Sequence, residues 1–115
     1  MDAHDLIEIE ARLSATADTL IRSASAVAMA RQIKEYASDQ RKNLLARYTA
    51  PLLKDTSATA AETLARADPR YQQDLNEQMD QYRQAEQHIA TWDALKCKLE
   101  ALRSALNFGK SQIQI

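Results

Sequence analysis

The chain has 115 residues and a formal net charge of -1, which suits one domain with no bulk electrostatic attraction to nucleic acid or a membrane. It contains one glycine and two prolines among many alanine, leucine, glutamine and arginine residues. This helix-forming composition excludes a β-rich fold and predicts the all-α class.

The first predicted helix covers residues 3–49. Asp2 and Asp5 suit its start, because carboxylates interact favourably with a helix N-terminus. The run of small side chains over residues 23–30 admits a close partner helix or marks a break near Ser23, and we expect an unbroken helix. Pro51 ends it, because proline disfavours the α conformation in Ala50. Apolar residues recur along one stripe at Leu6, Ile9, Leu13, Leu20, Val27, Ala30, Ile33, Ala37, Leu44 and Tyr48.

The connection spans residues 50–67 and includes a short helix. Thr59 and Glu62 have the spacing of a capping box, so we expect this helix to begin at Thr59 and to end near Ala67. Asp68 and Pro69 then start the next helix, because aspartate accepts hydrogen bonds from free N–H groups and proline suits the first turn.

The second long helix is predicted over residues 69–108, with Gly109 as its C-cap. Residues 109–115 form the C-terminal tail, for which we expect a frayed end, with an extended segment that pairs with a partner as the alternative. The apolar stripe of this helix comprises Tyr71, Leu75, Met79, Tyr82, Ala85, Ile89, Trp92, Leu95, Leu99, Leu102 and Leu106.

The charge pattern favours an antiparallel hairpin of the two long helices, with the short helix at the turn. Residues 1–21 and 55–94 carry net charges of -4 and -5, whereas residues 22–54 and 95–115 carry +5 and +3. Folding the chain back near residue 58 sets each block beside one of opposite sign. Each exposed pair contributes only about 0.2–1 kcal/mol, but together the pairs disfavour a parallel register.

The apolar stripe of the second helix is wider than one partner helix can cover. We therefore expect the hairpins to assemble into a homo-oligomer, a helical bundle. The residues expected at this oligomer interface are Tyr82, Ile89, Trp92, Leu95, Leu99, Leu102 and Leu106.

No residue pattern indicates catalysis, and we expect no enzyme activity, no metal and no cofactor. His4 and His88 lie in different elements without a second ligand at metal spacing, and Cys97 has no adjacent histidine to activate it. We expect Cys97 to be half-buried. The single cysteine favours a reducing cytoplasm, the acidic first ten residues lack the features of a signal peptide, and no run is apolar enough to span a membrane.

Basic residues of the first helix form a candidate nucleic-acid-binding site. Arg31, Lys34, Arg41 and Lys42 can share a broad face at the helical period, and Arg47 follows them. A row of cations suits the phosphates of single-stranded DNA, with binding that weakens as salt rises. The alternative is that these charges only solvate the helix and pair with the acidic block opposite.

Two patterns in the sequence carry a family resemblance. The pattern Ala65-x-x-Asp68-Pro69-x-Tyr71, followed by residues 95–104, resembles small helical bacteriophage proteins that accompany recombination genes. Residues 40–47 resemble the basic DNA-binding segment of the T4-type, UvsY-like recombination mediators, and residues 101–113 resemble their C-terminal assembly region. The chain departs from that family in its thinner basic segment and in the absence of a glycine-rich turn.

The resemblance implies an oligomeric mediator that binds single-stranded DNA. Such a protein acts in the cytoplasm of a bacterial host, where it helps to load a recombinase onto strands covered by single-strand-binding protein. Arg41, Lys42 and Arg47 would contact phosphates. The alternative is a non-enzymatic coiled-coil module for protein interaction, such as a scaffold, a secretion chaperone or an inhibitor of host defence. Binding of single-stranded DNA at low and high salt distinguishes the two.

Overall fold

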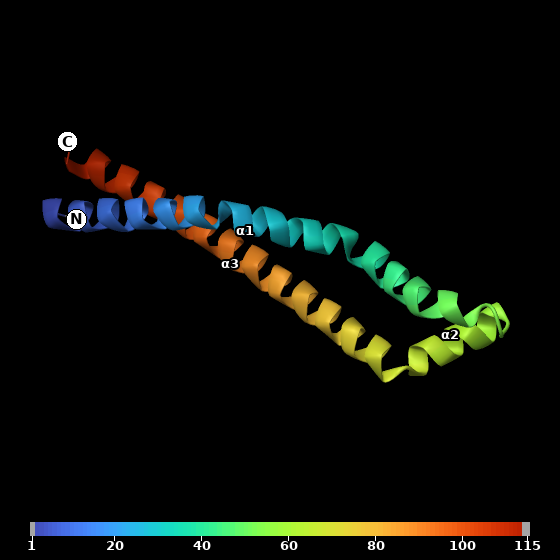
Figure 1. The fold of residues 1–115 in the computed structure, drawn as a ribbon. Helices are drawn as coiled ribbons and strands as arrows, with labels where there is room; N and C mark the ends of the chain where they lie inside the picture. Colours follow the sequence, from blue (N-terminus) through green and yellow to red (C-terminus); the bar gives the residue numbers. More distant parts are fainter. Residues whose placement is uncertain (1, 114–115) are drawn as a thin grey trace. The chain divides into compact units, whose positions relative to one another are not determined.

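The chain is a helical hairpin, seen in a computed structural model that describes residues 2–113 (Figure 1). The first long helix is α1 (Ala3–Thr49), followed by a 3-10 turn, η1 (Ala50–Leu52). The short helix α2 (Ala58–Ala67) leads into the second long helix, α3 (Pro69–Ile113). Residues 2–113 contain no strand, and the predicted all-α class and hairpin are confirmed.

Helix α1 begins with a reciprocal pair of hydrogen bonds. The Asp5 N–H donates to Asp2 Oδ1 at 2.9 Å, and the Asp2 N–H donates to Asp5 Oδ2 at 3.2 Å. These bonds satisfy two of the donors that a helix start leaves free. The helix passes through Ser23 without a break and ends before Pro51, over the range expected from the sequence.

Helix α2 begins earlier than the sequence analysis predicted. Its N-cap is Ser57, whose hydroxyl accepts a hydrogen bond from the Ala60 N–H at 3.3 Å. Thr59 lies inside the first turn instead, so the capping box at Thr59 is wrong. The physical reason is that Ser57 already occupies the position from which a side chain reaches the third N–H of the helix.

Helix α3 begins where the sequence predicted. Asp68 Oδ1 accepts a hydrogen bond from the Arg70 N–H at 2.9 Å, and Pro69 is the first helical residue. The Arg70 guanidinium also donates to Asp68 Oδ2 at 3.0 Å, which adds a salt bridge to the cap.

The predicted end of α3 at residue 108 is wrong, because the helix continues to Ile113. Gly109 is buried within it and does not have the positive φ of a C-cap glycine. A glycine interior to a helix costs about 1 kcal/mol relative to alanine, which packing beside α1 must offset. The tail expected over residues 109–115 is therefore helical as far as residue 113, and residues 114–115 lie outside the described part.

The chain divides into two compact units, each built from a part of α1 and a part of α3. The turn unit is Met29–Glu86, and it contains α2. The terminal unit combines the residues up to Ala28 with those from Gln87 onward.

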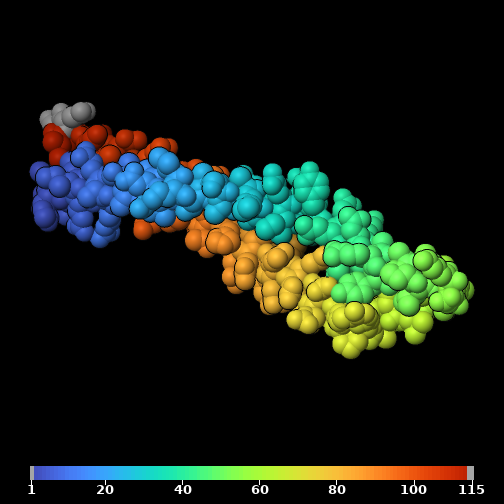
Figure 2. All heavy atoms as spheres, viewed as in Figure 1, coloured from blue at the N-terminus to red at the C-terminus, as the bar shows by residue number. Residues whose placement is uncertain are grey.

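The core of the turn unit combines small side chains with two large ones, Leu44 and Tyr71. Leu44 is 1% exposed, and Ala61 and Ala65 of α2 are fully covered. The rings of Tyr48 and Tyr71 meet edge to face, with centroids 5.7 Å apart. In Figure 2, the atoms of α1 and α3 lie against one another in this unit, where Figure 1 draws the two ribbons apart.

The core of the terminal unit is thin. Leu20 and Val27 are its buried large apolar residues, and the buried Thr16 hydroxyl donates to the Arg12 carbonyl at 2.8 Å. The Trp92 indole N–H crosses from α3 and donates to the Leu20 carbonyl at 3.3 Å. The other large residues of the α3 stripe in this unit are only half-buried.

Candidate functional site

The five predicted nucleic-acid-binding residues are all exposed, but they do not form one surface. At about 100° per residue, Arg31, Lys34, Arg41 and Lys42 fall within a sector of about 100° around α1. We call these four residues the basic face. Arg47 lies about 120° away from its nearest member, so it does not extend this surface.

Lys34 of the basic face is already engaged with α3. Its Nζ lies 3.9 Å from a Glu86 carboxylate oxygen and 5.8 Å from the centroid of the Tyr82 ring. An exposed ion pair of this length contributes less than about 1 kcal/mol, so an arriving phosphate can compete for the amine. Arg41 and Lys42 have no ion-pair partner among residues 2–113.

Arg47 faces acidic residues. It lines one groove with Asp74 and Glu77 of α3, and a second groove with the ion pair of Asp68 and Arg70. Phosphate groups would be repelled by these carboxylates, so the surroundings of Arg47 are poorly suited to a nucleic-acid backbone.

The seven predicted interface residues share one property in the hairpin: all are half-buried. Trp92 shows how this arises, because its indole N–H is bound to α1 while Lys96 lies 4.7 Å from its ring centroid. Each of the seven side chains therefore keeps apolar surface that a second chain can cover.

Further exposed apolar side chains were missed by the sequence analysis. In the terminal unit, Ile7, Ile21 and Phe108 are 65%, 73% and 62% exposed. They lie off the stripe that was used to find the core, and isolated apolar residues off the stripe carry no periodic signal. Met79, which was placed in the α3 stripe, is also exposed, and Gln78 takes the half-buried position beside it.

The turn unit contains a cleft of 280 Å³ between α1 and α3, which we call the Gln78 cleft. Ile33, Ala37 and Arg41 line it from α1, and Gln78, Met79 and Tyr82 line it from α3. No sequence pattern indicates this cleft, because its lining residues are interspersed along two helices that lie apart in the chain.

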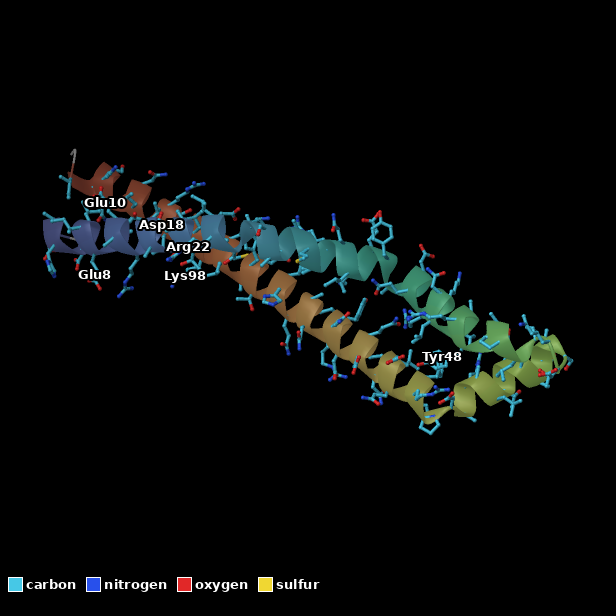
Figure 3. The ribbon with its side chains drawn as sticks, in the orientation of Figure 1. Glu8, Glu10, Asp18, Arg22, Tyr48 and Lys98 are labelled. Atoms are coloured by element: carbon cyan, nitrogen blue, oxygen red, sulfur yellow. The ribbon has the colours of Figure 1, made fainter. Side chains whose placement is uncertain are left out.

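A cluster of polar side chains lies beside the start of α3 in the turn unit. Tyr48 lies between the two long helices (Figure 3), and its O–H donates to Asp74 Oδ2 at 2.6 Å. This hydrogen bond, followed by desolvation, raises the pKa of Tyr48 above its ordinary value of 10.0. The hydrogen bonds from Arg70 lower the pKa of Asp68, and the same pairing raises the pKa of Arg70.

Cys97, His4 and His88, the residues considered for metal or thiol chemistry, do not form a common site. Cys97 is exposed, which corrects the half-buried position expected for it, because it falls outside the inward-facing stripe of α3. His4 and His88 are also exposed. Within residues 2–113, no three His, Cys, Asp or Glu side chains form a group that could hold a metal ion, and no helix is long and apolar enough to cross a membrane.

Comparison with protein-family models, curated proteins and solved structures finds no match to this chain. The placement of its own residues therefore carries the functional interpretation.

Proposed function

We propose that this chain is a non-enzymatic assembly module whose hairpins associate with one another. The thin core of the terminal unit is the observation that carries the proposal. Its α3 stripe remains half-exposed after packing on α1, and Ile7, Ile21 and Phe108 add apolar surface outside that contact. Association of two or more copies removes this surface from water, and each Å² of apolar surface buried contributes about 25 cal/mol of favourable free energy.

Sedimentation equilibrium tests this proposal directly. The monomer mass is 12.9 kDa, and we expect a larger species whose fraction rises with protein concentration. Mass action requires this concentration dependence for any reversible association. A single species at the monomer mass throughout the micromolar range would contradict the proposal.

The basic face supports a second candidate function, the binding of single-stranded DNA. Its four cations are exposed within one sector of α1, and Arg41 and Lys42 are unpaired among residues 2–113. A single chain offers few phosphate contacts, so its affinity would be low. Assembly would repeat the basic face and raise the apparent affinity, because later contacts become intramolecular. Loading of a recombinase would be a consequence of this binding.

Fluorescence anisotropy with a labelled deoxythymidine oligonucleotide distinguishes the two candidates. Each phosphate contact adds about 0.7 to the slope of log affinity against log salt on single strands. We expect the double variant Arg31→Ala and Lys42→Ala to weaken binding and to lower that slope. Arg47→Ala is the matched control, because Arg47 lies off the basic face and should leave binding unchanged. If the parent protein does not bind at low salt, the DNA function is wrong and the assembly module alone stands.

A further inference from the structure

The Gln78 cleft combines an apolar floor with a mouth of charged groups. Ile33, Ala37 and Tyr82 supply the floor, from facing turns of α1 and α3, and the exposed Met79 lies at its edge. An apolar cavity of about 150 Å³ is sufficient for benzene. At 280 Å³, this cleft has room for one substituted aromatic ring and is too small for a helix.

The charges at the mouth leave one cation without a counter-ion. The Arg83 guanidinium lies 3.2 Å from Asp80 Oδ1, and the Glu86 carboxylate lies 3.9 Å from Lys34 Nζ. Arg41 also lines the cleft, and it has no ion-pair partner among the described residues. The unpaired guanidinium therefore favours an anion, most strongly a carboxylate that can accept two hydrogen bonds from it.

Gln78 lines the cleft with a side chain that is held against α1. Its Nε2 donates to the Gln40 carbonyl at 3.4 Å, whereas its Oε1 is buried and has no hydrogen-bond partner. Because this oxygen is closed to solvent, a ligand in the open cleft does not reach it, and recognition of a ligand rests on the apolar lining and on Arg41.

We propose that the Gln78 cleft binds a small aromatic carboxylate. The carboxylate pairs with Arg41, and the ring packs on Ile33 and Tyr82. Tyr82 also belongs to the half-buried stripe on which association is proposed, whereas Arg41 lies outside that stripe, so replacement of Arg41 tests this site separately from self-association.

Titration of the isotope-labelled full chain with 4-hydroxybenzoate, followed by heteronuclear NMR, tests the proposal. We expect saturable shifts confined to α1 near residues 33–41 and α3 near residues 78–86. Arg41→Gln should weaken binding about tenfold, because it removes a charge-assisted hydrogen-bonding pair. Lys42→Gln is the matched control, since it removes the same charge one residue away, does not line the cleft, and should leave the affinity unchanged.

Two outcomes would overturn the proposed site. One is a set of shifts that fails to saturate, and the other is equal weakening of binding by Arg41→Gln and Lys42→Gln.

Discussion

At the scale of single residues, Tyr48 makes two different contacts in the turn unit. Its ring packs against Tyr71, and its O–H donates to Asp74. The two contacts are separable, because phenylalanine retains the ring and loses only the hydroxyl. The hydrogen bond raises the pKa of Tyr48, which means that the folded state favours the protonated phenol.

This raised pKa predicts a loss of stability at high pH. The contribution is fully present below the pKa of an unfolded tyrosine, about 10, and is lost as pH rises through the higher folded pKa. Tyr48→Phe should lower Tm at neutral pH and should flatten the fall in Tm above about pH 10. Thermal unfolding followed by circular dichroism measures both effects. Tyr36→Phe, at an exposed tyrosine, is the control, and an identical high-pH fall in Tyr48→Phe and the parent would contradict the prediction.

Asp68 gives the opposite dependence on pH. The pairing with Arg70 lowers its pKa, so its contribution is present above the unfolded value of about 3.9 and is lost as pH falls through the folded value. Asp68→Asn keeps an N-cap acceptor but removes the charge. At neutral pH its Tm should lie between those of the parent and Asp68→Ala, and near pH 2 the parent and Asp68→Asn should converge. Persistence of the full difference at low pH would contradict this assignment.

At the scale of elements, the helix starts and stops followed from the sequence where local chemistry decides them. Pro51 stops α1 and Asp68 with Pro69 starts α3, because each acts within one turn of its own position. Gly109 was misassigned because its role depends on α1, which lies beside it in space and far from it in the chain. Ser57 was missed because a nearby residue, Thr59, offers the same cap chemistry.

The inward-facing stripe of α3 was also predictable only in part. Its apolar members follow a three-and-four spacing, but the half-buried residue at position 78 is a glutamine. A search for apolar residues therefore chose Met79, its exposed neighbour. The Gln78 cleft could not be predicted either, because it forms only where α1 packs beside α3.

Replacement of Gln78 predicts a gain in stability. Gln78→Leu keeps nearly the same volume and removes the unpaired Oε1, at the loss of a long 3.4 Å bond to the Gln40 carbonyl. We expect stabilisation of about 1 kcal/mol, which corresponds to a rise in Tm of roughly 4 °C. Gln84→Leu at an exposed position of α3 is the control, and it should change stability by less than about 0.5 kcal/mol. A lower Tm in Gln78→Leu would show that Oε1 is satisfied in solution.

At the scale of the whole molecule, charge does little to oppose association. The formal net charge is -1, so copies of the chain repel one another weakly near neutral pH. The alternating acidic and basic blocks also provide partners of opposite sign for a neighbouring copy. The proposed association has two candidate surfaces, the half-buried stripe of α3 and the apolar residues exposed outside it.

Two glutamate variants separate these possibilities. Leu99 is half-buried in the hairpin, so Leu99→Glu places a charge against α1 and should reduce both helical content and association. Ile21 is 73% exposed, so Ile21→Glu should leave Tm nearly unchanged and lower the mass seen by sedimentation equilibrium. Ala15→Glu adds the same charge at an exposed position on another side of α1 and should preserve the assembled mass. Loss of association in Ala15→Glu as well would mean that added charge, rather than loss of the Ile21 side chain, separates the copies. Retention of the assembled mass in Ile21→Glu would instead place the contact on the half-buried stripe.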